Sequence, residues 1–148
     1  MFLGEYSHNL DDKGRLTLPA RWRELLGERV VVTRGMERCL LIFTVADFEK
    51  FVREATAGGM TGADARGLSR FLSSKATDDT PDKQGRIIIP PSLREHAGLN
   101  GEAMLVGAFD HIEVWNPANY AQVDAELVKN VPDMSERVNQ ALRRMGDK

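Results

Sequence analysis

The feature that most constrains the fold of this chain is an internal repeat. Residues 11–27 align with residues 82–98 at an offset of 71, and seven of the 17 aligned positions are identical. With one residue inserted in the second copy, the similarity continues at an offset of 72 and pairs residues 35–48 with residues 107–120. Glycine and proline recur at turns for generic reasons, but paired aspartate and arginine positions do not, so the pattern indicates a duplication. The identical pairs are Asp11/Asp82, Gly14/Gly85, Arg15/Arg86, Pro19/Pro90, Arg23/Arg94, Glu24/Glu95 and Gly27/Gly98.

Both copies predict the same order of elements. Each Asp-x-x-Gly-Arg tract predicts a tight turn, in which the aspartate side chain caps the backbone and glycine takes a positive φ. A strand follows, and then a proline that ends the strand and begins a short helix, which stops at a glycine. Two more strands follow in each copy. The predicted elements are strand 15–18, helix 20–26 and strands 30–33 and 39–43 in the first copy, and strand 86–89, helix 91–97 and strands 104–106 and 111–115 in the second.

Amphipathic helices are expected to close the two copies. Thr44 predicts an N-cap, and the residues after it repeat apolar side chains at i, i+3, i+4 and i+7. Asn116 and Pro117 predict the cap and first residue of the corresponding helix, and Pro132 predicts the start of a separate C-terminal helix. A glycine-rich break at residues 58–62 separates the copies. We therefore expect four segments: a first repeat (1–57), a linker and connecting helix (58–75), a second repeat (76–128) and a C-terminal helix (129–148).

The composition is that of a folded protein without a membrane segment. The chain has 148 residues, of which 42% are hydrophobic and 28% charged, and its apolar runs are far too short to cross a bilayer. Half of such a chain buries little core by itself, so the two copies are expected to share one. The N-terminus does not resemble a secretory signal, and Cys39 is the only cysteine, which fits a reducing compartment. We expect a cytoplasmic protein.

The sequence offers no pattern typical of catalysis, a cofactor or a metal ion. His8, His96 and His111 are scattered, and none has a cysteine or histidine neighbour at the spacing of metal ligands. Cys39 lies in an apolar strand pattern and is expected in the core. The glycine pair after residue 57 lacks the frame of a phosphate-binding loop. We therefore expect neither an enzyme nor a protein that binds a small-molecule substrate.

The tract Gly4-Glu5-Tyr6 and the repeated tracts at residues 11–19 and 82–90 resemble those of MraZ proteins, of the SpoVT/AbrB-type superfamily. The resemblance covers essentially the whole chain. It implies an α+β, β-rich fold, in which two tandem repeats form a pseudo-symmetric double-split (swapped-hairpin) β-barrel with flanking helices. It also implies a sequence-specific DNA-binding regulator of transcription, which forms a ring-shaped homo-oligomer. Such proteins bind tandem direct repeats upstream of their own division and cell-wall operon, mainly repress it, and lie over the nucleoid.

The chemistry of the two repeated tracts supports DNA binding. Asp11 can hydrogen-bond Arg15 and hold its guanidinium in one orientation, and the second tract can do the same. An oriented arginine can grip a phosphate, or bind guanine O6 and N7 through two parallel bonds, and it loses less entropy on binding than a free one. The first tract is the stronger candidate because more cations surround it. The predicted DNA contacts are Arg15, Lys13, Arg86, Lys83, Arg21 and Arg23, with Asp11, Gly14, Asp82 and Gly85 as motif partners.

Charge limits how these residues can work. The formal net charge of the chain is −2. Residues 11–24 hold four cations against three carboxylates, and residues 82–95 hold three against two, so each tract is only about +1. Because affinity for DNA depends steeply on the number of phosphates neutralised, we expect several copies of the chain to engage DNA together.

Several alternatives stay open at this point. Each Asp–Arg pair can be a salt bridge that only fixes a turn. The chain can be an AbrB/MazE-like antitoxin module, which predicts a disordered C-terminal tail that binds a toxin, or a scaffold ring that does not bind DNA. The apolar stripe predicted after Pro132 fits either an oligomer contact or packing onto its own domain.

Overall fold

The computed structural model of the chain describes residues 1–57 and 61–146. It contains two compact units, Met1–Pro117, which holds all the described strands, and Ala118–Lys148, whose described residues belong to one helix. Most of the glycine-rich break predicted at residues 58–62 lies outside the described residues. Along the described chain, no helix combines the length and the apolar character needed to span a membrane.

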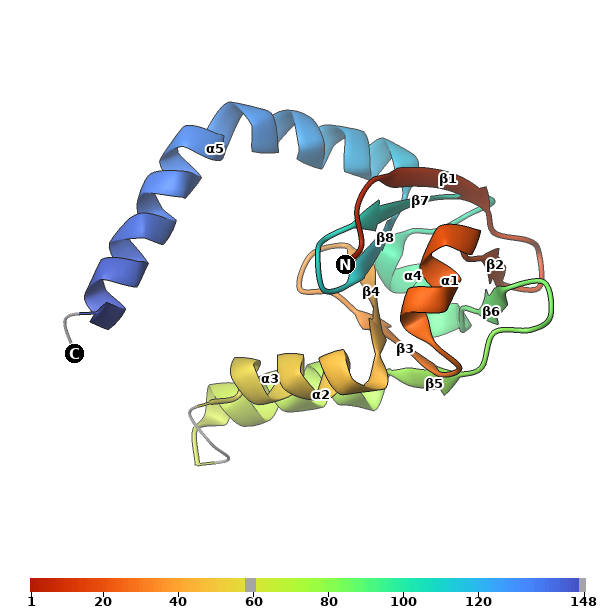
Figure 1. Cartoon of the computed structure of the whole chain (residues 1–148), viewed down its shortest axis with the longest axis horizontal. Coiled ribbons are helices and arrows are strands. Elements are labelled where there is room, and N and C mark those ends of the chain that lie inside the picture. The colour runs from red at the N-terminus through yellow and green to blue at the C-terminus, as the bar shows by residue number, and fades with distance from the viewer. Residues whose placement is uncertain (58–60, 147–148) are drawn as a thin grey trace. The chain divides into compact units, whose positions relative to one another are not determined.

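The described strands form two antiparallel sheets (Figure 1). The strands are β1 (Glu5–Asn9), β2 (Arg15–Thr17), β3 (Val30–Arg34), β4 (Cys39–Thr44), β5 (Thr77–Asp79), β6 (Arg86–Ile88), β7 (Glu102–Gly107) and β8 (Ile112–Trp115). The larger sheet has the order β1-β7-β8-β4-β3-β5, and the smaller one pairs β2 with β6. The expected α+β, β-rich class is confirmed. A closed barrel is not found among the described strands, because β1 and β5 remain the edges of the larger sheet.

The two copies of the repeat exchange strands. β1 of the first copy pairs with β7 of the second, and β5 of the second copy pairs with β3 of the first. β4 and β8 lie together at the middle of the larger sheet, and β2 pairs with β6. The counterparts in the two copies are β1 and β5, β3 and β7, and β4 and β8. Exchanging each strand for its counterpart gives the same strand order of the larger sheet, read from the opposite edge. The duplication in the sequence is therefore also a pseudo-symmetry of the sheets.

Both copies contribute to one hydrophobic core, as expected for halves too small to fold alone. Leu16 and Leu18 of the first copy, and Ile87 and Ile89 of the second, are completely buried in it. Trp22 is 1% exposed and meets aromatic rings near the N-terminus edge to face. The apolar alternation along β2 and β6 therefore fastens the smaller sheet to the core.

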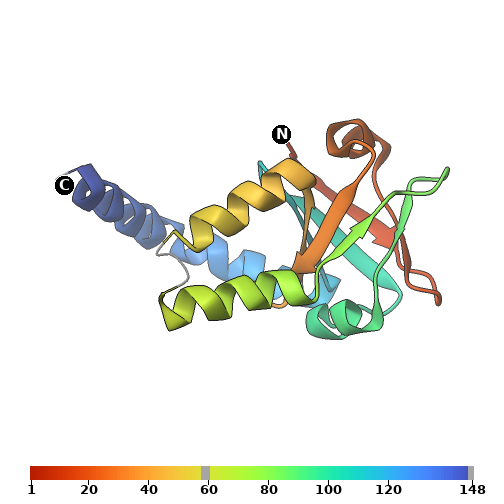
Figure 2. The ribbon, with the colours of Figure 1, turned by 90° about the horizontal axis from the view of Figure 1, so that it is seen from below.

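The described residues of the first unit form four helices: α1 (Ala20–Leu26), α2 (Val45–Ala55), α3 (Ala63–Ser74) and α4 (Pro91–Ala97). The Thr44 side chain caps α2, since its oxygen accepts a hydrogen bond from the N–H of Asp47 (3.1 Å). Figure 2 shows α2 and α3 side by side and running in opposite directions, and α3 also contacts β3. The Arg34 guanidinium lies 4.0 Å from the centre of the Phe71 ring and donates to the Phe71 carbonyl, which ties α3 to that strand.

The helix at the end of the chain corrects one expectation. Residues 117–128 and the segment after Pro132 were predicted as two helices, but α5 (Pro117–Gly146) is a single helix of 30 residues with Pro132 inside it. Proline removes one backbone hydrogen bond and crowds the preceding turn, so it bends a helix without always ending it. Figure 1 shows such a bend in α5. The boundary expected at residue 129 does not separate two helices.

Candidate nucleic-acid interface

The first Asp–Arg pair lies in a tight loop, here called loop 1 (residues 11–15). Asp11 Oδ1 accepts hydrogen bonds from the backbone N–H groups of Lys13 (3.0 Å) and Arg15 (2.8 Å). Asp11 Oδ2 accepts a third from Nε of Arg15 (2.6 Å). The Gly14 N–H donates to the Asp11 carbonyl (3.0 Å) and closes the turn. One carboxylate therefore both shapes the turn and orients the guanidinium.

The second pair repeats this arrangement in loop 2 (residues 82–86). Asp82 Oδ1 accepts from the backbone N–H groups of Gln84 and Arg86, both at 2.9 Å. Asp82 Oδ2 accepts from Nε of Arg86 (2.8 Å), and the Gly85 N–H donates to the Asp82 carbonyl (2.9 Å). Both networks are therefore equivalent, although Gln84 stands in loop 2 where loop 1 has Lys13.

Glycine is required in both loops for two reasons. Gly14 and Gly85 have φ values of +81° and +75°, a region that residues with a Cβ rarely adopt. A Cβ added to Gly14 would also come within 2.8 Å of the Ile89 carbonyl oxygen, and one added to Gly85 would overlap the guanidinium of Arg23. Each loop is therefore packed against residues of the other copy.

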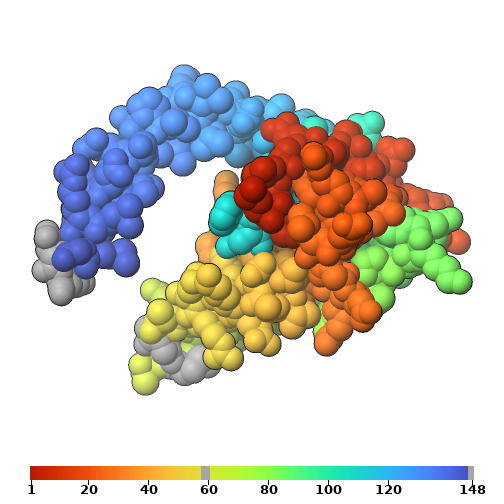
Figure 3. Space-filling model, in the orientation of Figure 1, coloured from red at the N-terminus to blue at the C-terminus, as the bar shows by residue number. Residues whose placement is uncertain are grey.

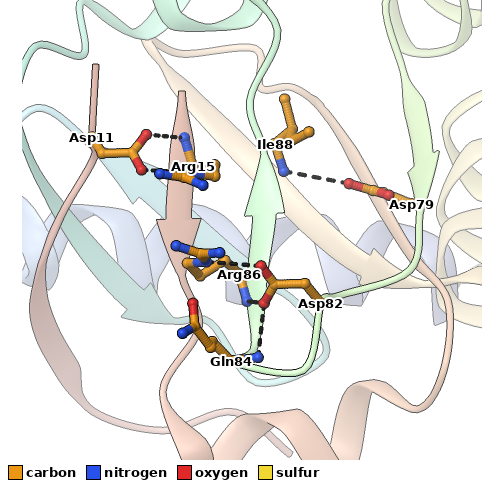
Figure 4. A network of polar contacts seen from close by, with 7 residues as sticks. All are labelled: Asp11, Arg15, Asp79, Asp82, Gln84, Arg86 and Ile88. Atoms are coloured by element: carbon orange, nitrogen blue, oxygen red, sulfur yellow. Dashed lines mark hydrogen bonds and ion pairs between the residues drawn. The ribbon is translucent and has the colours of Figure 1, made fainter. Parts of the chain in front are cut away.

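The β2–β6 ribbon places both arginines on one exposed face. Side chains alternate along a strand, and directly opposed residues of an antiparallel pair share a face. Leu16 and Ile87 point into the core, so Arg15 and Arg86 lie on the outer face, about 7 Å apart along the strand direction. Figure 4 shows the two Asp–Arg pairs on neighbouring strands. The opposed residues are Arg15 with Ile88, Leu16 with Ile87, and Thr17 with Arg86.

Hydrogen bonding keeps both carboxylates ionised. The backbone N–H of Arg15 is the main cause that lowers the pKa of Asp11; partial desolvation opposes the shift, and the Arg15 side chain adds to it. The backbone N–H of Arg86, followed by its side chain, likewise lowers the pKa of Asp82. A carboxyl group whose pKa is lowered in the folded state stays paired until the pH falls through that lowered value. The arginines are therefore held in place throughout the neutral range.

The other predicted contacts lie at different places. Lys13 and Lys83 are exposed at the tips of loops 1 and 2. Arg23 of α1 donates from Nε to the Leu18 carbonyl (2.8 Å) and lies against loop 2, so it supports that loop. Arg21, also on α1, donates to the Tyr6 hydroxyl (3.2 Å) on β1, and no described contact joins it to either loop. The structure thus brings together the loop residues and Arg23, and leaves Arg21 apart from them.

One residue of the site was missed by sequence reasoning. Arg94 of α4 is the counterpart of Arg23, and its guanidinium lies beside Gly14 of loop 1. Its Nε is buried, and no described residue accepts a hydrogen bond from it. The signal was present, because Arg23/Arg94 is one of the identical pairs of the repeat. Arg23 of the first copy therefore supports loop 2, and Arg94 of the second copy supports loop 1.

Cysteine and histidine chemistry is not part of this surface. Cys39 is 2% exposed, as expected of a core residue, and burial raises the pKa of its thiol far above the ordinary value. Among residues 1–57 and 61–146, no three side chains of the metal-binding types lie close enough to hold an ion. The groups available for recognition are the guanidinium and ammonium groups of loops 1 and 2.

Fold and site together define a duplicated α+β protein, whose two copies share one core and present paired Asp–Arg loops on a single ribbon. The family model described as "MraZ protein, putative antitoxin-like" matches residues 1–71 and again residues 72–143. The chain therefore belongs to the MraZ family.

Similar proteins carry one name. A "Transcriptional regulator MraZ" of Parafrankia sp. is 44% identical over 138 residues, which are 93% of this chain and 96% of the relative. Proteins of the same name from Roseiflexus castenholzii and Thermobifida fusca are 44% and 39% identical and span 88% and 93% of this chain, and 91% and 96% of their own lengths. These relatives are named as regulators of transcription and not as enzymes.

Proposed function

We propose that this chain is a DNA-binding regulator of transcription that inserts the β2–β6 ribbon into the major groove. The observation that supports this most directly is the pair of pre-oriented arginines on one outer face of the ribbon. A two-stranded ribbon fits the major groove of B-form DNA. Asp11 and Asp82 engage only Nε in the described contacts, so the Nη groups of Arg15 and Arg86 are the donors for guanine edges or phosphates.

Self-assembly is the second part of this proposal. With Arg23 bonded to a backbone carbonyl and Arg21 bonded to the Tyr6 hydroxyl, one copy offers few free cations to DNA. Affinity and its salt dependence scale with the number of phosphates neutralised. Several copies in a ring-shaped homo-oligomer, bound to tandem direct repeats, would supply the missing contacts. We place these repeats upstream of the chain's own division and cell-wall operon, which the protein represses, in the cytoplasm and at the nucleoid.

The exchanged strands support the swapped-hairpin form of the fold. The pairings β1–β7, β5–β3 and β2–β6 each join one copy to the other, so neither copy has a complete sheet of its own. In this proposal the two sheets wrap one core as a double-split barrel, without a continuous ladder between them. The segments 1–57 and 76–128 are then repeats that fold only together.

The proposal is tested by binding of the purified chain to the duplex immediately upstream of its own gene. Arg15→Ala is expected to reduce affinity about five- to 150-fold, the value of one bidentate base contact. Arg15→Lys, the matched control, keeps the charge but not the planar fork, so it should retain the salt dependence and lose discrimination between bases. Unchanged affinity and salt dependence in a folded Arg15→Ala protein would contradict the assignment. A scaffold ring predicts no binding by the wild-type chain at any moderate salt concentration.

Loss of the orienting carboxylate is expected to reduce specificity. Asp11→Asn removes a negative charge from the interface, so affinity for unrelated DNA should stay constant or rise. Affinity for the upstream duplex relative to scrambled DNA should fall about three- to tenfold, because the Arg15 guanidinium then loses rotamer freedom on binding. Asp12→Asn makes the same change of charge beside the network and serves as the control. An equal loss of specificity in both variants would show that orientation by Asp11 is not the cause.

The antitoxin alternative is less well supported. It predicts a disordered tail at the C-terminus that binds a toxin. The described C-terminal residues up to Gly146 are helical instead, with an apolar stripe.

A further inference from the structure

An exposed isoleucine lies on the outer face of the β2–β6 ribbon. Ile88 is 56% exposed, whereas Leu16 and Ile87, on the inner face of the same ribbon, are completely buried. Side chains alternate along a strand, so Ile88 shares the outer face with Arg86, two residues before it. Figure 3 shows the segments that carry loop 1 (red) and loop 2 (green) at the surface, at the same end of the first unit. The face proposed to meet DNA is therefore not purely polar.

The register of the ribbon places Ile88 directly beside Arg15. The two residues are opposed in the antiparallel pair, and Figure 4 shows them on neighbouring strands. The Arg15 N–H donates to Asp11 Oδ1 (2.8 Å). The Ile88 N–H donates to Asp79 Oδ2 (3.3 Å), so the two opposed residues form a non-hydrogen-bonded pair. Residues paired in this way have Cα atoms only about 4.5 Å apart, so the Ile88 side chain stands next to the pre-oriented guanidinium.

The other end of the ribbon differs at this position. By the repeat alignment Ile88 corresponds to Thr17, which is opposed to Arg86. One end of the outer face therefore combines arginine with isoleucine, and the other combines arginine with threonine. The hydrogen-bond networks of the two loops are equivalent, so this is a difference in the outer face itself. The two ends of a pseudo-symmetric ribbon are thus chemically distinct, which allows the ribbon to distinguish the two orientations of a DNA site.

The major groove offers a specific partner to an apolar side chain on this face. Thymine is marked there by its C5-methyl group, which apolar side chains contact. Base pairs of B-form DNA are about 3.4 Å apart along the helix axis, a spacing close to that of two opposed residues in the ribbon. A guanidinium that binds a guanine edge therefore places Ile88 against the base pair beside that guanine. Contact between its aliphatic carbons and a methyl group removes apolar surface from water, which stabilises the complex.

We propose that Ile88 recognises the methyl group of a thymine in the base pair next to the guanine that Arg15 binds. This inference rests on the proposed function and adds a second element of base recognition to it. Ile88 carries no charge and does not bind phosphate, so it contributes to the choice of sequence and not to affinity for DNA in general. The Arg15 end of the ribbon then reads a guanine and a thymine in adjacent base pairs. The Arg86 end offers the hydroxyl of Thr17 as well as a methyl group, and so has a different preference.

The test removes the methyl group from the DNA and leaves the protein unchanged. Deoxyuridine pairs with adenine as thymidine does and lacks only the 5-methyl group. The thymidines of the upstream duplex are replaced by deoxyuridine, first all together and then one at a time. The wild-type chain should bind about fourfold more weakly for each contacted thymine that is replaced, which is the value of one buried methyl group. Fluorescence anisotropy at a fixed salt concentration measures the affinity for each duplex.

Two variants assign the methyl preference to Ile88. Ile88→Ala removes the carbons that would contact the methyl group, so it should bind the thymidine and deoxyuridine duplexes alike. The position is exposed, so the variant should fold; circular dichroism checks this, and Ile88→Ser replaces an alanine variant that unfolds. Met36→Ala is the matched control, because it shortens another apolar residue, 60% exposed, in the β3–β4 turn. It should keep the wild-type preference for thymidine.

Equal binding of both duplexes by the wild-type chain would overturn the proposal. A preference for thymidine that persists in Ile88→Ala would also overturn it, because the preference would then arise from the DNA or from another residue. In that case Ile88 is an ordinary exposed strand residue, chosen for its β-branched side chain. Failure of the proposed function is a separate result, in which Arg15→Ala binds the upstream duplex as the wild-type chain does. Weaker binding by Arg15→Ala, with no effect of deoxyuridine on the wild-type chain, would remove only the thymine contact.

Discussion

Trp22→Ala is expected to destabilise the fold by about 3–5 kcal/mol, as is typical for removal of a buried aromatic side chain. Trp22 is 1% exposed, and its ring meets those of Tyr6 (4.8 Å between centroids) and Phe2 (6.0 Å), both close to perpendicular. The truncation would leave a cavity where α1, β1 and the N-terminal residues meet. Denaturant titration at a fixed protein concentration measures the effect, because self-assembly would make the midpoint depend on concentration.

Trp22→Phe is the matched control for this prediction. It keeps an aromatic ring and removes less volume, so it should cost less than the alanine variant. If Trp22→Ala cost under about 1 kcal/mol, α1 would not be packed on the core as described. Because Arg23 follows Trp22 on α1 and supports loop 2, the alanine variant should also weaken DNA binding at temperatures where the rest of the fold persists.

Loops 1 and 2 could be predicted from the sequence because their contacts are local. The hydrogen bonds that the Asp11 side chain makes in loop 1 join residues at most four apart, and the aspartate, glycine and arginine involved are the residue types that such a turn requires. The strand after each loop alternates apolar and polar residues, which also fixes the face of its arginine. The orientation of Arg15 by Asp11 was therefore foreseeable without knowledge of the tertiary structure.

The exchange of strands between the copies could not be predicted in the same way. β1 (Glu5–Asn9) and β5 (Thr77–Asp79) are short and mostly polar, and they lack the alternation that marks a half-buried strand. They become strands through distant partners, β7 and β3. The support of loop 2 by Arg23 depends on the same exchange, so the arginine was assigned to DNA and its structural contact was missed.

The position of a proline in the sequence does not show whether a helix begins there, and α5 is an example. Pro132 was taken as the first residue of a new helix because proline is favoured there. Proline is also tolerated inside a long helix, where the residues on both sides continue the helical pattern and the chain only bends. Local sequence does not distinguish these two cases.

Replacement of both arginines should have the largest effect on function. If each makes one bidentate contact, the Arg15→Ala/Arg86→Ala double variant should bind the upstream duplex at least about 25-fold more weakly than the wild-type chain. The side chains of Arg15 and Arg86 are 33% and 29% exposed, so their loss should change the free energy of unfolding little. Fluorescence anisotropy against the upstream and a scrambled duplex measures the affinity, and denaturant titration the stability.

The double variant also separates recognition from a purely structural salt bridge. If the Asp–Arg pairs only fix the turns, the double variant should lose stability and bind both duplexes as before. If they recognise DNA, the double lysine variant should keep most of the affinity for scrambled DNA and lose preference for the upstream duplex, since lysine supplies charge without a planar fork. The single variants Arg15→Ala and Arg86→Ala then show how much of the lost affinity comes from each copy of the repeat. Because Lys13 lies beside Arg15 and Gln84 beside Arg86, Arg15→Ala should cost more than Arg86→Ala, and equal losses would show that both loops contact DNA alike.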